Sequence, residues 1–588
     1  MSREEYPRPQ FKRTEWKNLN GIWDFRLTDE EEWTHINVPF VFQSKLSHIG
    51  KKNSMCDRMQ YRRVFSIPND WKGKKIILHF GAVDYFAKVY INGKLAGAHE
   101  GGNTGFAFDI TDLLTNETEL LEVCVTDPCD DETILRGKQF WQKEACGIWY
   151  TRSSGIWQTV WLEPVNPVHI EKVRFTSDID TGNVDIKLFL SEVKENLSCR
   201  ISISANDNQI NDIVIRPGQK EVSVVLNVFG NKILNTSTHG NGMCWSPENP
   251  VLFETSLRLF LNDVEVDKVQ SYFGMRKIEA RNGMIYLNNH PYIQKLLLDQ
   301  GYWPDGLITA PSDEAFRKDI CMAKAMGFNG CRKHQKCEDP RFLYWADKIG
   351  FLVWGEMAAC PQFTADSAVR TMNEWASAVN RDYNHPSIVT WVALNESWGV
   401  PQIERDTMQQ AFSLALYYEI KSLDKTRLVI SNDGWEITKS DICTIHNYQH
   451  GHEQETSKQQ AFRDNISTLK SILNMQPSGR KIYAGTYEYN GEPVMLTEFG
   501  GISLDTQGSD NWGYTYVQSG TQLEIVYQRL IEDIKASEVL FGYCYTQLAD
   551  VQQETNGLLT EDRKYKVDPQ IIKKINDGVC YMHPIVWE

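Results

Sequence analysis

The sequence predicts a multidomain protein in which a jelly-roll β-sandwich and an immunoglobulin-like β-sandwich precede a C-terminal (β/α)8 TIM barrel. The chain has 588 residues, which is too long for a single hydrophobic core. Up to about residue 276, short runs alternate apolar and polar residues, as is typical of antiparallel sheets. From about residue 280, short apolar runs alternate with longer helical patterns, which indicates parallel strands covered by helices.

The first predicted domain spans residues 1–165 and is expected to be the jelly roll. Its segment KKIILHFGAVDYFAKVYINGKLAGAHEGG alternates apolar and polar residues, and Asn92-Gly93 lies between two strand-like runs. Asn-Gly is a preferred dipeptide of two-residue hairpin turns. The segment GIWQTVWLEP, residues 155–164, predicts another aromatic strand, which ends at Pro164.

The second predicted domain spans residues 166–276. The segments VDIKLFLSEV, CRISISAN, KEVSVVLNVF and LFETSLRLFLN all contain stretches with a period of two, separated by turn-forming residues. A span of about 110 residues with this pattern fits one immunoglobulin-like sandwich. No candidate catalytic residue falls in this range.

The third predicted domain, residues 277–588, carries eight candidate strands with helices between most of them. This count favours an eight-fold barrel over an open doubly wound sheet. No GxGxxG or GxxxxGK[ST] motif follows any of the strands, which argues against nucleotide binding. The helices are expected at 312–325, where Ser312 begins a capping pattern, and at 338–349, 366–383, 402–423, 456–474, 521–536 and 568–576.

Composition excludes several classes of protein. The formal net charge of −15 disfavours nucleic-acid binding, and no run of about 18 apolar residues predicts a membrane span. The N-terminus has no apolar segment of a secretory signal. The 13 cysteines are scattered without a CxxC pair, so we expect reduced thiols and a cytoplasmic protein. A secreted protein sequenced without its signal is the alternative.

Polar residues end almost every predicted barrel strand. Active sites of such barrels lie at the C-terminal ends of the strands, so these side chains are expected to meet at one rim. They are Asp299, Arg332–His334, Glu356, Asn395–Glu396, Asn432–Asp433, Asn447–Tyr448, Glu498 and Gln547.

Glu396 and Glu498 stand out because each directly follows a buried apolar run, WVALN and VMLT. They close the predicted fourth and seventh strands, which lie across the barrel mouth. Two carboxylates that flank one bond are what glycoside hydrolysis requires, one as proton donor and the other as nucleophile or base. The structural alternative for either glutamate alone is a buried ion pair with an arginine.

The histidines of this region carry weaker signals. His334 by itself is expected to be structural, and His446 is interpreted as a satisfied core histidine because it lies inside a strand. His450-Gly-His452-Glu453 has the wrong spacing for a HExxH zinc motif. We therefore predict no metal site.

Four segments resemble glycoside hydrolase family 2, which includes β-galactosidases, β-glucuronidases and β-mannosidases. NHPSIVTWVALNESWG (384–399) resembles the acid/base signature of the family, and PVMLTEFGG (493–501) resembles its nucleophile signature. FGMRKIEARNGMIYLNNHP (273–291) is similar to the junction into the barrel, and GIWYTRSSGIWQTVWLEP (147–164) to the close of the jelly roll. The resemblance covers essentially the whole chain. Family members often form dimers or tetramers, so a homo-oligomer is a further expectation.

The resemblance implies a retaining, exo-acting enzyme with a carbohydrate substrate and no cofactor. Glu396 would be the general acid/base and Glu498 the nucleophile. Asn395 would bind the hydroxyl next to the anomeric centre, Tyr448 would orient Glu498, and Arg332 would hold carboxylates at the barrel floor. Trp303 and Asp305 would help Asp299 to shape the pocket. The candidate substrate-binding residues are Asp299, Arg332, His334, Asn395, Trp398, Tyr448, Trp512 and Tyr545.

Departures from the family pattern bear on the substrate. The glucuronidases of the family read the sugar carboxylate with an Asn-x-Lys pair, whereas this chain has Glu554-Thr555-Asn556 before Gly557, which disfavours a uronic acid. The large β-galactosidases hold magnesium through a Glu and a nearby His, and Glu356 lacks that His. Tyr545 stands near the end of the eighth strand, where the family commonly has tryptophan.

Three functions remain open at this stage. The first is release of a terminal neutral sugar, with a β-galactoside as the first guess. The second is hydrolysis of an α-L-arabinofuranoside or a β-galactofuranoside, because LLLDQGYWPDG and CRKHQK resemble a less characterised subgroup. The third belongs to another class: a carbohydrate-binding protein without catalytic activity.

Overall fold

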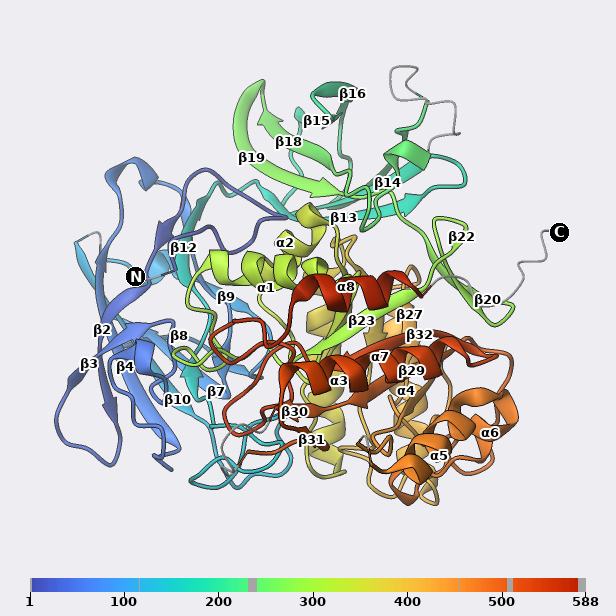
Figure 1. Ribbon diagram of the computed structural model, residues 1–588. Helices are drawn as coiled ribbons and strands as arrows, with labels where there is room; N and C mark the ends of the chain where they lie inside the picture. The colour runs from blue at the N-terminus through green and yellow to red at the C-terminus, as the bar shows by residue number, and fades with distance from the viewer. Residues whose placement is uncertain (1–2, 116, 231–240, 453, 505–510, 580–588) are drawn as a thin grey trace.

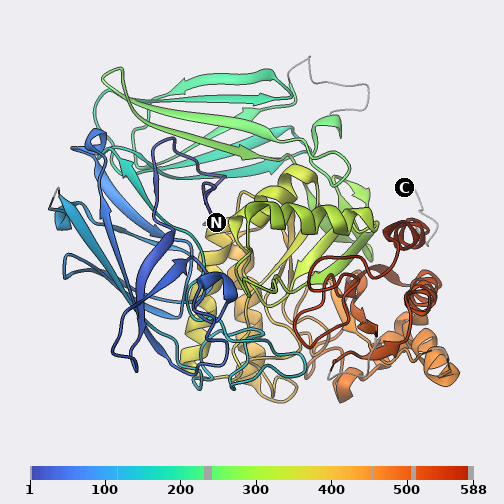
Figure 2. The ribbon, with the colours of Figure 1, turned by 60° about the vertical axis from the view of Figure 1, so that its left-hand side comes forward.

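The computed structural model describes residues 3–115, 117–230, 241–452, 454–504 and 511–579. Two β-sandwiches and one barrel pack side by side, and the second sandwich lies above the other two bodies in both views (Figures 1 and 2). The first sandwich, drawn in blue, lies beside the barrel in both views. The fold class expected from the sequence is confirmed. The boundaries 1–165, 166–276 and 277–588 remain proposed limits of the three domains.

The first sandwich is antiparallel. Its hairpin turn is the one that the sequence predicts, because Asn92 and Gly93 both have positive φ, 52° and 76°, as a tight turn of this kind requires. One sheet has the order β3 (Thr34–Val38), β2 (Gly21–Leu27), β4 (Arg58–Ser66), β10 (Thr118–Thr126), β7 (Phe86–Ile91), β8 (Lys94–Glu100). The other has the order β1 (Lys17–Asn18), β12 (Val160–Val165), β5 (Lys75–Phe80), β9 (Phe106–Asp109), and β11 (Gly155–Ile156) pairs with β6 (Val83–Asp84).

The second sandwich encloses its own apolar core. Alternate residues of its strands point inward, for example in β14, where Val184, Ile186, Leu188 and Leu190 are buried. Its sheets are β13 (Ile170–Asp178), β14 (Asn183–Leu190), β17 (Glu221–Asn227) and β16 (Asn208–Ile215), β15 (Leu197–Ala205), β18 (Phe253–Leu261), β19 (Val264–Phe273). A small sheet of β20 (Ile278–Arg281), β21 (Met284–Leu287) and β22 (His290–Pro291) leads into the barrel.

The barrel is an eight-stranded parallel sheet that is nearly closed, since β27 and β28 are its two ends. The strands are almost continuous apolar runs because both of their faces are covered. In chain order they are β23 (Gln294–Asp299), β24 (Gly330–Lys333), β25 (Leu352–Glu356), β26 (Ile388–Val392), β27 (Leu428–Ile430), β28 (Cys443–His446), β29 (Val494–Gly500) and β32 (Leu540–Thr546). The short strands β30 (Ile502–Leu504) and β31 (Thr515–Val517) follow β29.

Helices cover the outside of the barrel and begin close to the predicted positions. Ser312 accepts a hydrogen bond from the Ala315 N–H, which confirms the predicted cap. The helix expected at 456–474 is two helices, because Thr468 adopts an extended conformation and caps the second one. The helices are α1 (Asp313–Ala325), α2 (Pro340–Ile349), α3 (Ala365–Asp382), α4 (Thr407–Leu423), α5 (Thr456–Ser467), α6 (Leu469–Asn474), α7 (Gly520–Lys535) and α8 (Pro569–Asp577).

Two apolar layers fix which side chains can reach the barrel mouth. One layer fills the barrel interior with residues such as Trp354, Met495 and Cys544. The other lies between the strands and the helices. Polar side chains at the strand ends therefore sit above a packed floor, at one rim of the barrel. None of the described helices combines the length and the apolar character needed to cross a bilayer.

Candidate active site

The two strand-end glutamates meet at the barrel mouth. Glu396 follows β26, the fourth strand, and Glu498 lies in β29, the seventh. One carboxylate oxygen of each, together with one ring nitrogen of His446, lie within 4.8 Å of one another. Glu498 is 5% exposed, whereas the side chain of Glu396 is 20% exposed. A single small group could therefore contact both carboxylates.

Glu396 is held by a strained turn. Its φ is 51° and that of Ser397 is 60°, and such conformations cost side-chain-bearing residues about 1–3 kcal/mol each. The turn is closed by a hydrogen bond from the Trp398 N–H to the Asn395 carbonyl, 2.9 Å. Glu396 N donates to the Asp433 carbonyl, 2.9 Å, and Ser397 N to the Asn432 side chain, 3.0 Å. Neighbouring backbone thus fixes the direction of the Glu396 side chain.

Arg332 is the hub of the site and is completely buried. Its guanidinium contacts three carboxylates, those of Glu356 (2.6 Å), Asp433 (2.6 Å) and Glu498 (2.9 Å), and donates to Asn395 Oδ1 at 2.6 Å. Burial by itself would lower the pKa of the Arg332 guanidinium, but the three carboxylates raise that pKa well above its usual value. The planar guanidinium has several N–H donors, so it can hold several carboxylates at once. One of its N–H groups holds Asn395, the residue directly before Glu396.

Both carboxylate oxygens of Glu498 accept hydrogen bonds. Arg332 binds Oε1, and the Tyr448 hydroxyl donates to Oε2 at 2.6 Å. Burial would raise the pKa of Glu498, but the charges of His446 and Arg332 and the bond from Tyr448 lower it to about 2. The carboxylate is consequently ionised at neutral pH, which is the state that a nucleophile needs.

His446 lies between the two glutamates. Nδ1 is 2.8 Å from Glu396 Oε1 and 3.6 Å from Glu498 Oε2, while Nε2 is 3.2 Å from Asp433 Oδ2. Burial would lower its pKa, but Glu498 and Asp433 raise it to about 10. The ring is buried and both of its nitrogens have partners, as expected of a satisfied histidine, but those partners are carboxylates at the barrel mouth. Its place as the last residue of β28, at the same rim, was the available signal.

Glu396, His446 and Glu498 also form a cluster that could hold a metal ion by distance alone. The hydrogen bonds argue against that use. Both ring nitrogens of His446 face carboxylate oxygens, at 2.8 Å and 3.2 Å, so both are engaged in hydrogen bonds within the site. A metal ligand must be a neutral imidazole with a free nitrogen, so this arrangement favours a hydrogen-bonded cluster over a metal site. In the other proposed motif, His450 is held by the carbonyls of Gly451 and Gly500, and Glu453 lies outside the described residues.

A cavity of about 530 Å³ opens beside the glutamates and is lined by Glu396, His446, Tyr448 and the segment 474–478, among others. Tyr514, which the sequence analysis missed, stacks on Tyr448 with ring centroids 3.5 Å apart. Trp512 packs edge-on against Tyr514 at 4.7 Å. Trp512, one of the predicted substrate-binding residues, therefore contacts Tyr514, which in turn contacts Tyr448. The rings of Tyr514 and Trp512 extend the wall that Tyr448 forms.

The jelly roll also contributes to the mouth of the barrel, which the sequence analysis did not foresee. The Trp149 ring lies 5.1 Å from that of Trp398. The Tyr150 hydroxyl donates to Glu554 Oε2 at 2.6 Å, and Gln553 donates to the Trp149 carbonyl at 2.8 Å. The loop of the first domain accordingly contacts the barrel segment that carries Gln553 and Glu554. Only tertiary packing brings residues about 400 positions apart together.

Two other predicted substrate-binding residues differ in whether they join the hydrogen-bonded network around Arg332. His334 belongs to it, since its Nδ1 is 3.1 Å from the Arg332 guanidinium and 3.3 Å from Glu356. Asp299 instead binds Lys333 at 2.6 Å in a buried ion pair. Lys333 in turn pairs with Glu338 at 2.7 Å. The geometry thus gives Asp299 a structural role on β23.

The structure corrects the prediction made for Tyr545. It was expected to bind substrate, but it is completely buried in the layer between barrel and helices. Its ring packs against Phe499 and against Tyr527 of α7. Side chains of a strand alternate between faces, and Cys544 takes the face toward the interior. Trp303 likewise packs in the core against Phe316, while Asp305 pairs with Lys45 at the surface.

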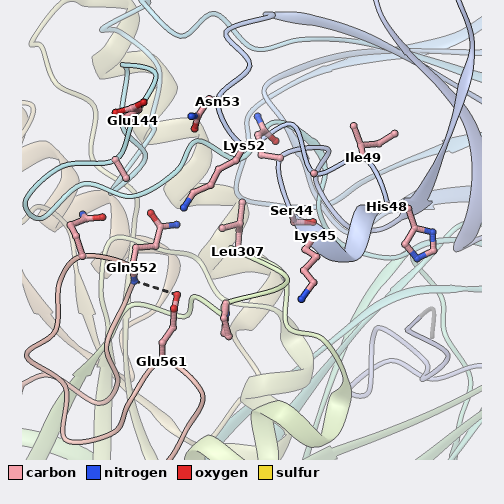
Figure 3. Close-up of a pocket in the computed structure, with 15 residues that line it drawn as sticks. Ser44, Lys45, His48, Ile49, Lys52, Asn53, Glu144, Leu307, Gln552 and Glu561 are labelled. Carbon is pink, nitrogen blue, oxygen red and sulfur yellow. Dashed lines mark hydrogen bonds between the residues drawn. The ribbon is translucent and has the colours of Figure 1, made fainter. Parts of the chain in front are cut away.

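A second cavity of about 760 Å³ lies between the jelly roll and the barrel (Figure 3). Its walls come from the segment 43–53 and Glu144 of the first domain, and from Leu307 and the segment 552–561 of the barrel. Amide, lysine and carboxylate side chains line it together with Ile49, Pro304 and Leu307. Such a mixed surface suits a ligand that has both hydroxyl groups and apolar faces.

Comparisons with known proteins agree with this geometry. Family models described as "Glycosyl hydrolases family 2, sugar binding domain", "Glycosyl hydrolases family 2" and "Glycosyl hydrolases family 2, TIM barrel domain" match residues 21–162, 168–276 and 309–580. A β-galactosidase of Thermoanaerobacter pseudethanolicus is 28% identical over 390 residues, which are 65% of this chain and 50% of that protein. The chain spans about half the length of the first curated relatives that it matches, 48% and 50%.

Solved structures share the fold over nearly the whole chain. A β-D-glucuronidase of Dictyoglomus thermophilum has a TM-score of 0.79 at 19% identity and covers 98% of this chain and 99% of its own. A β-galacturonidase of Eisenbergiella tayi has a TM-score of 0.75 at 18% identity, with full coverage of both chains. Three models of one family in their usual order, over a chain with paired glutamates at the barrel mouth, place this protein in glycoside hydrolase family 2.

Proposed function

We propose that this protein is a retaining, exo-acting glycoside hydrolase that releases a terminal neutral sugar, with β-galactosides as the first candidates. The observation that carries the proposal is the approach of Glu396 and Glu498 to within 4.8 Å. Retaining glycosidases hold their two carboxyl groups about 5–5.5 Å apart, whereas inverting enzymes leave about 6.5–9.5 Å for a water molecule.

Glu498 is the nucleophile in this proposal. Its lowered pKa keeps it ionised, and Tyr448 and Arg332 hold both of its oxygens. Glu498 attacks the anomeric carbon, and the bond to the leaving oxygen breaks as a covalent glycosyl ester forms. In this proposal Asn395, whose Oδ1 accepts a hydrogen bond from Arg332, binds the neighbouring hydroxyl of the sugar.

Glu396 is the acid and then the base. It gives its proton to the leaving oxygen, and it later removes a proton from the water that releases the sugar. Glu396 lines the cavity and is more exposed than Glu498, which suits a group that meets the leaving group and water. The imidazolium of His446, 2.8 Å away, offsets the negative charge that Glu396 acquires on losing its proton.

The surroundings of Glu554 support a neutral sugar. Glu554 is 2% exposed, accepts hydrogen bonds from Tyr150 and Asn556, and stands where the glucuronidases of the family carry their carboxylate-reading motif. A uronic acid bound beside this carboxylate would be repelled. The absence of a lysine at that place points in the same direction.

Hydrolysis of a uronide is the second candidate, because one observation favours it. Lys138 is 6% exposed, and among the described residues no carboxylate lies within ion-pair distance of it. Its Nζ lies 5.5 Å from the ring centroid of Trp149 and 5.7 Å from that of Tyr150. A buried cation beside the barrel mouth could pair with a carboxylate of the substrate. The glucuronidase and galacturonidase neighbours are consistent with this candidate.

The test is a panel of nitrophenyl glycosides: β-galactopyranoside, β-glucuronide, β-galacturonide, α-L-arabinofuranoside and β-galactofuranoside. Highest kcat/KM on the galactoside supports the proposal, and highest kcat/KM on a uronide, lost in Lys138→Met, favours the second candidate. A furanoside preference identifies the furanosidase alternative. NMR of the first-formed product must show retained configuration. Sugar binding without turnover, equal in the wild type and in Glu498→Ala, would instead identify a non-catalytic binding protein.

A further inference from the structure

Three tryptophans form a continuous row from the acid/base turn to the surface. Trp398 lies on the turn that carries Glu396. Trp149 packs edge-on against Trp398 at 5.1 Å and 84°, and Trp141 packs edge-on against Trp149 at 5.3 Å and 72°. Trp398 and Trp149 are half-buried, and Trp141 is 40% exposed. We call these three residues the tryptophan row.

We propose that the tryptophan row is a leaving-group subsite, which binds the ring of the sugar or aryl group that departs when the glycosidic bond breaks. This inference rests on the proposed function and names the part of the substrate that the row recognises. The leaving oxygen must lie next to Glu396, because that residue protonates it. Whatever is attached to that oxygen then extends away from the Glu396 turn, on which the row begins.

The chemistry of the row suits a flat ring with an apolar face. Aromatic side chains offer large, rigid contact areas, and a ring stacked on one of them gains more than its buried area alone provides. Trp141 lies at the surface in contact with Phe140 and Trp149. A single exposed aromatic residue is common on proteins, but here the partly exposed rings are contiguous from Trp398 to Trp141. Contiguous apolar surface is the kind that marks binding sites.

The row is rigidly anchored, as a subsite must be. Gly137 N donates to the Ala359 carbonyl at 3.0 Å, so the loop begins against the barrel. Gln553 donates to the carbonyls of Gly147 and Trp149, both at 2.8 Å, and the Tyr150 hydroxyl binds Glu554. The loop of residues 137–150 is therefore attached to the barrel at both ends, and Trp149 is fixed relative to Trp398.

The same loop continues to the larger cavity. Glu144, three residues after Trp141, forms part of the wall of the 760 Å³ cavity, opposite Lys52 and Gln552 (Figure 3). The buried hydroxyl of Ser44, another lining residue, has no protein partner. Polar groups beyond the last ring would receive the hydroxyls of a sugar leaving group. The arrangement thus favours an oligosaccharide over a small alkyl glycoside.

The experiment compares three substrates that share the sugar preferred in the panel: a methyl glycoside, a nitrophenyl glycoside and a disaccharide with glucose as leaving group. For each enzyme, kcat/KM on each ring-bearing substrate is divided by kcat/KM on the methyl glycoside. We expect this ratio to fall at least about fivefold in Trp141→Ala and further in Trp149→Ala. A fall with the disaccharide assigns the row to sugars, and a fall with the nitrophenyl glycoside alone assigns it to aryl groups.

The control is Trp33→Ala. Trp33 is also half-buried in the jelly roll, but its ring contacts Arg26 and Arg62, so the ratio should stay within twofold. If Trp149→Ala does not fold, Trp141→Ala decides, because its side chain is exposed. Unchanged ratios in Trp141→Ala with hydrolysis intact overturn this inference alone. A wild-type protein that hydrolyses none of the glycosides overturns the proposed function and the subsite together.

Discussion

His446 Nδ1 lies 2.8 Å from Glu396 Oε1, and this short contact links the two catalytic candidates. The same nitrogen is 3.6 Å from Glu498 Oε2, and the other nitrogen is held by Asp433. A protonated ring in this place counters the negative charge of Glu498 and Asp433, and that of Glu396 once it has given up its proton. It therefore limits the repulsion between the two glutamates at the step in which both are ionised.

The charge of His446 predicts how stability depends on pH. Its pKa in the folded protein is raised from 6.5 to about 10. A raised pKa contributes stability that is complete below the unfolded value of 6.5 and is lost as the pH rises through about 10. We expect the Tm difference between the wild type and His446→Gln to be largest at pH 6 and to shrink by pH 10. Scanning calorimetry measures it, and a difference that stays constant across this range would contradict the charged state.

Removing the nucleophile should abolish turnover. We expect Glu498→Gln to lower kcat by at least about three orders of magnitude, because an amide cannot form the glycosyl ester. The measurement is steady-state hydrolysis of the best nitrophenyl substrate. Glu374→Gln is the matched control, since Glu374 is equally buried but accepts its bonds from Asn103 and Thr104 at the jelly-roll contact. A loss of similar size in both variants would point to unfolding.

Removing the acid should affect substrates unequally. Glu396→Ala is expected to retain much of the activity on glycosides with strongly acidic phenol leaving groups, which need little protonation, and to lose it on an alkyl glycoside. Rates of cleavage for a series of phenols of different pKa measure this dependence. Added azide should also restore turnover of the activated substrates in this variant. Equal losses on all leaving groups would assign Glu396 another role.

Two tyrosines, Tyr448 just after β28 and Tyr545 within β32, test which face of the barrel reaches the site. Tyr448→Phe removes the hydroxyl that binds Glu498 Oε2 at 2.6 Å but keeps the stacking on Tyr514. We expect kcat to fall about tenfold or more, because a bond to an ionised group is worth about 1.5–3 kcal/mol. Tyr545→Phe is the control, and its kcat should stay within twofold. A similar loss in both would return Tyr545 to the substrate-binding set.

Much of the site was accessible from the sequence. An apolar run that stops at an acid marks a strand end, and strand ends of a barrel share one rim. That rule led to Glu396 and Glu498, to Arg332 and Asn395, and to Tyr448, all of which meet in one hydrogen-bonded network. The rule depends only on local sequence and on the strand count.

The tertiary structure decided the rest. His446 reads as a core residue until its neighbours are known, because burial and participation in a site have the same local pattern. The sequence predicts that Tyr545 lies at the rim, because it stands near the end of a strand. Successive side chains of a strand point to opposite faces, however, and the side chain of Tyr545 points outward to α7. The tryptophan row and the Tyr150 contact with Glu554 join separate domains. Contacts of that kind leave no periodic signal in the sequence, since their energy depends on how whole domains pack.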